Sequence, residues 1–286
     1  MSGPISARLP GNRLHLQHGP IDLIIQAFGD VQAVELAYHA AVDVFVDVLP
    51  GLVQELPRLR QSGEEQFKGP IAQRMARACR PFARSQFITP MAAVAGSVAD
   101  HMLQAMVTVA PLTRAYVNNG GDIALYLEPG QAMDIGIIDT VQAPKAVAMA
   151  TIQSTSAVRG IATSGQGGRS FSLGIADSVT VLAHSAAAAD AAATLIANAV
   201  TWDHPAIRRQ PANELDPDSD LGDRLVTTAV GALPPAVCAG ALAQGAILAR
   251  RYHQAGLIDS AYLSLQGQSR IVGPLPQSKF LEEVSA

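Results

Sequence analysis

A group of short β-rich segments in the middle of the chain constrains the fold more than any other feature of the sequence. Between Ala115 and Val181, short β-rich runs are separated by glycine-containing turns, as at Ile123–Leu127 and Ser178–Val181. Stretches with apolar residues at helical spacing lie on both sides, including Met91–Leu103 and Ala186–Val200. Strands grouped in this way and flanked by helices predict an α+β protein, with helices packed on antiparallel sheet.

The β-rich runs follow one another closely enough to predict an antiparallel meander. Its strands are expected at 115–117, 123–127, 135–138, 147–152 and 178–181. Nearer the amino terminus, Arg13–His18 and Ile21–Ile25 are joined by Gly19 and Pro20, and this pattern predicts a hairpin. Ser185 is expected to cap the helix that begins at Ala186.

The remaining elements are predicted from spacing and from helix breakers. Val31–Leu59 has helical spacing interrupted by Pro50 and Gly51, which predicts two helices with a break at that dipeptide. A short basic helix is expected from Pro70 to about Cys79. A strand at 225–230, a helix at 236–255 and a strand at 261–265 are expected to follow. The polar, proline-bearing segment 203–223 predicts a loop or lid inside a single domain that spans 1–286.

The composition narrows the class of protein. The chain has 286 residues, of which 49% are apolar and 15% charged, so it can build a hydrophobic core. Much of the apolar excess is alanine, and no run approaches the roughly 20 strongly apolar residues of a membrane-spanning helix, so a soluble protein is expected. A net charge of −4 with scattered basic residues disfavours nucleic acid as a partner. Two cysteines and no leader-like amino terminus make the cytoplasm the expected compartment.

Two glycine-containing turns have the chemistry to approach a ligand. In Asn118–Ile123, paired glycines let the backbone adopt positive φ and come close to a bound molecule, although the same pair is usual in a plain hairpin turn. In Ala162–Arg169, amides, hydroxyls and one guanidinium could face an anion. No lysine follows these glycines, so a phosphate loop of the Walker type is excluded and a flexible turn is the alternative.

One helix carries a potential pair of metal ligands. Asp190 and Thr194 are four residues apart, so both lie on one helix face as hard oxygen ligands of the kind that Mg²⁺ accepts. The alternative is an aspartate favoured by the helix dipole, with Thr194 bonded back to the Asp190 carbonyl. The acidic segment Asp216–Asp223 begins like a calcium loop, but Leu221 stands where the sharp-turn glycine belongs, so a solvated loop or a helix cap is expected there.

The order of these motifs resembles that of the ApbE-type flavin transferases, which move FMN from FAD onto a serine or threonine of a target protein. The matching positions are Gly96–Asp100, Gly120–Asp122, Ala162–Gly165 and Ala189–Thr194. From Asp216 to Gly267 the chain is more similar to an uncharacterised bacterial and archaeal branch related to ApbE. The resemblance implies a T-fold-like arrangement of antiparallel sheets and packed helices, in two interlocked subdomains with a flavin-nucleotide cleft between them.

The resemblance also implies a nucleotide site and a metal site. The nucleotide-binding residues that it implies are Gly96, Asp100, Asn119, Gly120, Gly121, Asp122, Thr163, Ser164, Gly165 and Arg169. The Ala162 carbonyl and the side chains of Asp190 and Thr194 are the implied metal ligands, and the carbonyl is expected within Mg–O or water-bridged reach of the Asp190 carboxylate. Asp122 is expected to point into the same cleft as Thr163–Gly165. The implied cofactors are FAD or FMN with magnesium, and the implied partners are a small-molecule nucleotide and, as one assembly state, a second copy of the chain.

Two elements of the resemblance are missing from this sequence. Ala95 stands where the family has a lysine, and Gly167–Ser172 replaces a segment that reads His-Ile-Ile-Asp-Pro in the family. Because transfer needs positioned cations and an activated hydroxyl, we expect binding of a flavin or another nucleotide diphosphate with a divalent metal, and no efficient transfer. An active magnesium-dependent FAD:protein FMN transferase and a non-enzymatic interaction module are the alternatives.

Overall fold

A computed structural model describes residues 3–63, 66–138, 146–274 and 278–280. The chain divides into two compact units, each built from three separated stretches of sequence. Unit 1 comprises Met1–Ala132, Gln153–Ala162 and Ala183–Ala191. Unit 2 comprises Met133–Ile152, Thr163–Leu182 and Ala192–Ala286. The stretches of the two units alternate along the sequence.

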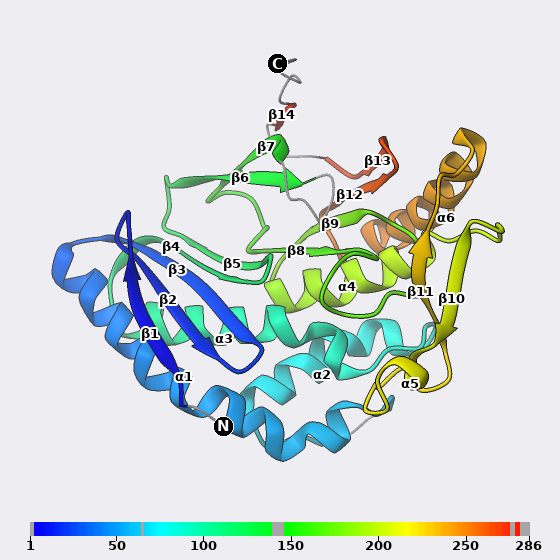
Figure 1. Ribbon diagram of the computed structural model, residues 1–286. Coiled ribbons are helices and arrows are strands. Elements are labelled where there is room, and N and C mark those ends of the chain that lie inside the picture. Colours follow the sequence, from blue (N-terminus) through cyan, green and yellow to red (C-terminus); the bar gives the residue numbers. More distant parts are fainter. Residues whose placement is uncertain (1–2, 64–65, 139–145, 275–277, 281–286) are drawn as a thin grey trace. The chain divides into compact units, whose positions relative to one another are not determined.

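Unit 1 is built on an antiparallel sheet (Figure 1). In order across the sheet, its strands are β1 (Ile5–Leu9), β2 (Arg13–His18), β3 (Ile21–Gly29), β4 (Leu112–Asn119), β5 (Asp122–Leu127) and the beginning of β8 (Gly160–Ser164). The predicted hairpin is confirmed as β2 and β3, with Leu16 opposite Leu23. Alternate residues of β2 and β3 are buried, since one face of the sheet is covered by helices.

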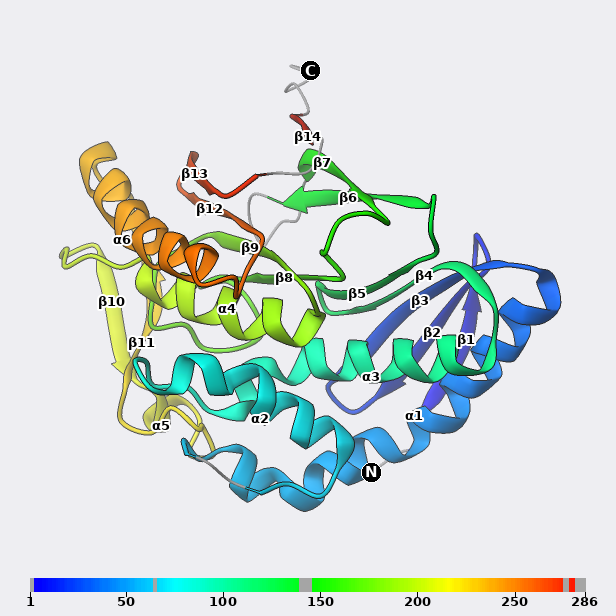
Figure 2. The same cartoon turned by 180° about the vertical axis from the view of Figure 1, so that it is seen from behind.

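Helices of unit 1 pack on this sheet and on one another. They are α1 (Val31–Leu59), α2 (Pro70–Ala83), the 3₁₀ turn η1 (Pro90–Ala93), α3 (Val94–Val109) and the first residues of α4 (Ala186–Ala199). Helix α3 contacts β4 and β5, and α1 contacts both α3 and β3 (Figures 1 and 2). Fully buried Phe45, Met102 and Met106 join Ile25 and Val117 of the strands in one core.

Helix α1 is continuous, so the predicted break at Pro50 and Gly51 is wrong. Its buried stripe runs through the dipeptide, with Phe45 and Val48 before it and Leu52 and Leu59 after it. Pro50 lies on the exposed side, where the backbone carbonyl that loses its partner can bind water. Burial of the apolar stripe therefore outweighs the helix-breaking tendency of the dipeptide.

By length and composition, α1 is also apolar enough to cross a membrane, contrary to the expectation that no segment would be. A third (33%) of its most apolar 18-residue window is buried against the rest of the protein. The helix begins with a polar cap, because Asp30 Oδ1 accepts a hydrogen bond of 2.8 Å from Gln32 N. The core helix of a folded unit has these same properties, so the composition of α1 is weak evidence for a membrane.

Unit 2 contains three smaller groups of strands. Strands β9 (Ser178–Ala183), β12 (Ser260–Leu265) and β13 (Gln268–Val272) are antiparallel neighbours, and helix α6 (Pro235–Gln254) packs on β12 and β13. A second group has the order β14 (Ser278–Phe280), β7 (Ala146–Gln153) and β6 (Ala132–Ile138). The third is a ribbon of β10 (Ile207–Pro211) and β11 (Leu225–Val230), with the short helix α5 (Ala212–Leu215) between them.

Several predictions about these elements need correction. The meander is wrong, because β5 pairs with β8 and the strands between them form a separate sheet with β14. The segment 203–223 is not simply a loop, since it contains β10 and α5. Helix α2 extends past Cys79 to Ala83, and strand β13 was not expected. The predicted strands at 225–230 and 261–265 and the helix between them are confirmed.

Candidate functional site

Asp190, on the first part of α4, faces the amino-terminal end of α3. Gly96 N donates a hydrogen bond of 3.0 Å to Asp190 Oδ2, and the Ala95 amide also bonds to this carboxylate. A Cβ atom at position 96 would lie 2.3 Å from the Ala186 carbonyl oxygen, so only glycine allows α3 and α4 to approach this closely. Gly96 therefore brings the first amides of α3 within reach of Asp190.

Asp100 makes the converse contact, from α3 to the amino-terminal end of α4. Its Oδ1 and Oδ2 accept hydrogen bonds from Ala186 N at 3.1 Å and from Ala187 N at 3.0 Å. The Arg74 guanidinium lies 4.0 Å from Oδ2. Burial raises the pKa of Asp100 and outweighs these favourable partners. The two helices thus cap each other through aspartates, which gives Asp100 a structural role at a position where a nucleotide contact was predicted.

The predicted Asn-Gly-Gly-Asp turn is a two-residue hairpin between β4 and β5. Asn119 pairs with Asp122, and the glycines between them have φ of 65° and 115°, a conformation that favours glycine. The Asn119 side-chain amide donates a hydrogen bond of 3.1 Å to the Ala95 carbonyl at the start of α3. The motif is therefore a hairpin, which holds the buried Asp122 near the amino-terminal end of α3, and its contact with a ligand stays a prediction.

Asp122 and Asp190 of unit 1 are close enough to interact electrostatically. Burial raises the pKa of Asp190 well above its usual range, and the nearby Asp122 carboxylate raises it further. Burial also raises the pKa of the Cys79 thiol, with a contribution from Asp190. Two carboxylates in such a setting repel each other unless a proton or a cation lies between them. The raised pKa favours the protonated form of Asp190, which removes the repulsion between the two carboxyl groups.

The proposed metal ligands are divided between the two units. Ala162 is fully buried in β8 and belongs to unit 1 with Asp190, whereas Thr194 lies in unit 2, one helical turn further along α4. Within the described residues, no three or more His, Cys, Asp or Glu side chains form a group that could hold a metal ion. Magnesium needs only one or two protein carboxylates, so this finding leaves the predicted ligand set open. The expected approach of the Ala162 carbonyl to Asp190 stays a prediction.

The other predicted nucleotide contacts lie in unit 2. Thr163 and Ser164 belong to strand β8, so the predicted turn begins only after them. The hydroxyls of Thr163 and Thr180 share a hydrogen bond of 2.9 Å. A Cβ atom at Gly165 would lie 2.5 Å from the Asp177 carbonyl oxygen, which explains the glycine by close backbone packing. Arg169 is exposed. These four positions stay predictions as ligand contacts.

Residues that the sequence did not single out complete the surroundings of the aspartates. A Cβ atom at Gly160 would lie within 2.0 Å of Ala186 N, so this glycine allows β8 to contact the beginning of α4. Cys79 donates a long hydrogen bond of 3.4 Å to the Thr89 carbonyl beneath the site. In the sequence, the role of Gly160 is indicated only by its position within a β-rich run, where a glycine often marks close approach of another backbone segment.

Comparison with known proteins gives UPF0280 relatives and distant likenesses to solved ApbE structures. The chain is 37% identical to a UPF0280 protein of Methanothrix thermoacetophila over 55% of its own length and 62% of that protein. It is 34% identical to a UPF0280 protein of Methanopyrus kandleri over 52% of its length and 56% of that protein. The chain thus spans less than two thirds of the curated relatives that it matches. The apo form of the flavinyl transferase ApbE from Pseudomonas stutzeri is 12% identical, with a TM-score of 0.47 over 96% of this chain and 94% of that one.

The family match covers nearly the whole sequence. The family described as AbpE bacteria matches residues 6–271, which include the glycine turns, both helix caps and the aspartate pair. The order of motifs from which an ApbE-type relationship was predicted lies inside this range. The chain therefore belongs to the AbpE bacteria family, and its predicted place in the ApbE-like superfamily is confirmed.

Proposed function

We propose that this protein binds a nucleotide diphosphate, with a flavin nucleotide as the first candidate, together with a divalent cation. The observation that carries the proposal is the Asp190 carboxylate held by Gly96 N at 3.0 Å, with the buried Asp122 carboxylate near enough to interact with it electrostatically. Two carboxylates supply hard oxygen ligands, which Mg²⁺ prefers, and the rest of its coordination shell comes from water and substrate phosphates. The donors present in unit 1 therefore fit a magnesium ion.

Asp190 and Asp122 would hold this cation, and the resemblance adds the Ala162 carbonyl and the Thr194 hydroxyl as further oxygen ligands. A bound cation would neutralise negative charge on the diphosphate. The protein's own contribution is positioning, because the hydrogen bond from Gly96 N to Asp190 Oδ2 fixes the carboxylate before a ligand arrives. Asn119 fixes the hairpin that carries Asp122 in the same way, through its bond to the Ala95 carbonyl.

We further propose that binding is not accompanied by efficient FMN transfer. The carboxylate of Asp100 is engaged by two α4 amides, so it is a poor candidate for the base that activates an acceptor hydroxyl. Ala95 offers a methyl group where the family has a lysine. In place of the family's histidine segment, the chain has Gly167–Ser172, and Ser172 bonds to Asn198 of α4. Loss of general-base help typically costs about 10²–10⁴ in rate.

The binding proposal is tested by titrating the purified protein with FAD, with and without magnesium, and following flavin fluorescence. Asp190→Asn is the informative variant, since its amide oxygen can still accept the bond from Gly96 N while it supplies no charge to a cation. We expect this variant to lose the magnesium-dependent part of binding, with affinity lowered at least about tenfold. Asp47→Asn, a substitution at an exposed position of α1, is the matched control and should bind as the wild type does. Equal magnesium-dependent affinity in the Asp190 variant would contradict the proposed site.

The absence of efficient transfer is tested separately. The protein is incubated with FAD, magnesium and a threonine-containing flavinylation target, and the products are separated on a denaturing gel. We expect no strong covalent fluorescence on the target. Robust labelling that depends on Asp190 would restore the transferase interpretation while leaving the binding site intact.

A further inference from the structure

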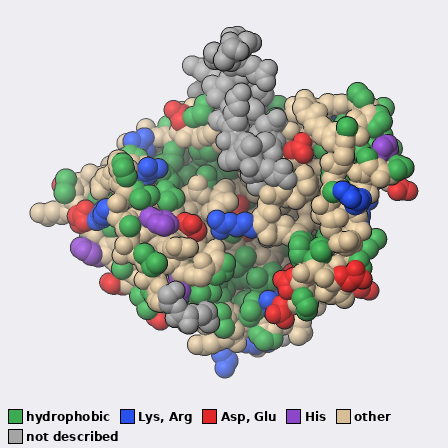
Figure 3. All heavy atoms as spheres, viewed as in Figure 1, with side chains coloured by type: hydrophobic (Ala, Val, Ile, Leu, Met, Phe, Trp, Pro, Cys, Tyr) green, Lys and Arg blue, Asp and Glu red, His purple; other side chains and the backbone are tan. Residues whose placement is uncertain are grey.

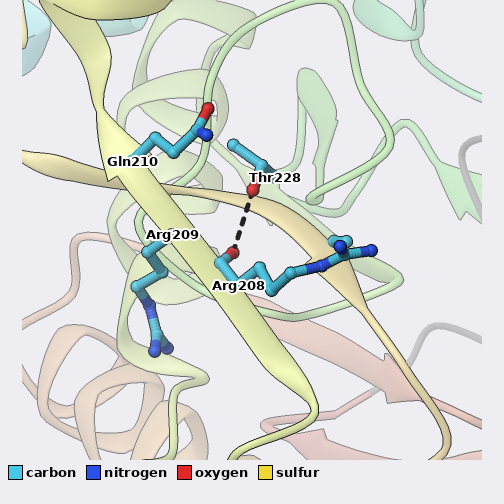
Figure 4. A pocket seen from close by; sticks show the side chains of 5 residues that line it. Arg208, Arg209, Gln210 and Thr228 are labelled. Carbon is cyan, nitrogen blue, oxygen red and sulfur yellow. Dashed lines mark hydrogen bonds between the residues drawn. The ribbon is translucent and has the colours of Figure 1, made fainter.

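A cavity in unit 2 is lined by residues that have no part in the site described above. It opens on the β10–β11 ribbon, has a volume of about 360 Å³ and is lined by Arg208, Arg209, Gln210, Thr228 and Ala229 (Figure 4). This volume is within the range of roughly 300–1,000 Å³ that is usual for small-molecule sites. The resemblance to flavin transferases assigns none of these residues a role.

The cavity coincides with a β-bulge. Arg208 pairs with Ala229, but the next residue, Arg209, pairs with Thr227, so Thr228 has no partner in the ladder. Its hydroxyl donates a hydrogen bond of 3.3 Å to the Arg208 carbonyl instead (Figure 4). Bulges bend a strand, redirect side chains and are common beside functional sites. Here the bulge is placed where two consecutive arginines line one cavity.

The two arginines differ in how they are held. Arg209 Nη2 donates hydrogen bonds of 2.9 Å to Thr201 Oγ1 and 3.2 Å to the Trp202 carbonyl, which fixes its direction. Arg208 is exposed, and within the described part of the chain its guanidinium makes neither a hydrogen bond nor an ion pair. Figure 4 shows the two side chains leaving β10 in different directions. Arg208 is therefore the cation that is available to a ligand.

The other lining groups favour an anion as well. The Gln210 amide and the Thr228 hydroxyl can donate hydrogen bonds, and no carboxylate is among the lining residues. This concentration of donors stands out in a chain whose net charge is −4, and Figure 3 shows Lys and Arg side chains scattered over the face in view. The planar guanidinium matches phosphate oxygens in a two-pronged geometry. No aromatic side chain lines the cavity to stack on a nucleobase.

We infer that this cavity binds the phosphate end of a small phosphorylated molecule, with Arg208 as its principal contact. Arg209 adds positive charge from a fixed position, and Gln210 and Thr228 add neutral donors. This inference does not rest on the aspartate pair of unit 1. The two sites also differ in chemistry, because the aspartates need a cation to accept a phosphate whereas the arginines do not.

The test is titration of the full-length protein with inorganic pyrophosphate by calorimetry, in the presence of EDTA so that no divalent cation takes part. We expect saturable binding by the wild type and a loss of about 10- to 100-fold in affinity for Arg208→Ala. Arg208→Lys, which keeps the charge without the planar fork, should lie between the two. Arg270→Ala removes another exposed arginine, from β13, and should change the affinity less than about twofold, as expected for a charge outside the site.

Four results would overturn the inference, and each is distinguishable from failure of the proposed function. They are absence of saturable binding by the wild type, equal weakening by Arg270→Ala, equal weakening by Asp190→Asn, and tighter binding of malonate than of pyrophosphate. Equal weakening by Arg270→Ala would indicate general electrostatic attraction, and equal weakening by Asp190→Asn would indicate binding near the aspartates. The fourth would assign the cavity to dicarboxylates. Because Arg208 is exposed, thermal unfolding of both Arg208 variants should match the wild type, which confirms that they are folded.

Discussion

Replacement of Gly96 by alanine tests the contact between α3 and α4 directly. The added Cβ atom would lie 2.3 Å from the Ala186 carbonyl oxygen, 2.5 Å from the carbonyl carbon and 2.8 Å from Ala187 N, all of which are backbone atoms. Overpacking of this kind typically costs about 1–3 kcal/mol. The start of α4 must move, which weakens its cap at Asp100 and adds about 1 kcal/mol. The better helix propensity of alanine returns at most about 1 kcal/mol.

The net expectation for Gly96→Ala is a loss of about 2 kcal/mol, or roughly 4–8 °C in Tm for a unit of this size. Thermal unfolding followed by circular dichroism measures it, and hydrogen exchange at 94–100 and 186–190 locates it. Gly51→Ala is the matched control, since Gly51 lies in α1 with no atom within 4 Å of an added Cβ, and this change should stabilise the protein by up to about 1 kcal/mol. A Gly96 variant as stable as the wild type would refute the close-packing explanation.

Three further predictions concern single side chains of unit 1. Asp100→Asn keeps one acceptor oxygen but points an amide donor at an α4 N–H group. We therefore expect the free energy of unfolding in urea to fall by about 1 kcal/mol. An unchanged urea midpoint would contradict the capping role of Asp100. For Asp190, a folded-state pKa above the unfolded value means that its stabilising contribution is present below the unfolded pKa and is lost as pH rises through the folded pKa. Without metal, the stability of the wild type relative to Asp190→Asn should therefore increase as pH falls from 7 towards 4, on top of a constant loss in the variant from its weakened cap of α3; a difference that does not change with pH would contradict the raised pKa. Tyr38→Phe removes a hydroxyl that accepts a hydrogen bond of 3.1 Å from the buried Ala27 N and donates one of 2.6 Å to the Asn12 carbonyl. We expect it to lower the free energy of unfolding by about 1–3 kcal/mol in the same urea assay. An unchanged stability would mean that water replaces the hydroxyl.

Local patterns in the sequence predicted local structure well. The alternation in β2 and β3 and the intervening Gly19 and Pro20 were sufficient for the hairpin, because its register depends on neighbouring residues only. Ser185 was likewise recognisable as a cap, and its hydroxyl accepts a hydrogen bond of 3.2 Å from Ala188 N. The pairing of β5 with β8 was not predictable in this way. It depends on which strand completes the buried sheet, and no residue near β5 specifies that choice.

The candidate site was predictable from the order of its motifs but not in its details. Gly96, Asp122 and Asp190 were each singled out, and in the structure Gly96 in the first turn of α3 bonds to Asp190, which interacts with Asp122. The bonds of Asp100 to Ala186 and Ala187 cross 86 and 87 positions of sequence, so spacing could not reveal them. Nor could it reveal the bulge at Thr228, which is defined only by the register of two paired strands.

The reciprocal capping of α3 and α4 changes how a glycine and an aspartate at the positions of Gly96 and Asp100 should be interpreted in a related sequence. Gly96 and Asp100 are needed for two helices to meet, whether or not anything binds beside them. A descendant that has lost its ligand should therefore still keep both residues, because selection on folding alone preserves them. A sequence motif based on this glycine and aspartate would therefore identify the contact between α3 and α4. It would not distinguish proteins that still bind a ligand from proteins that have lost it.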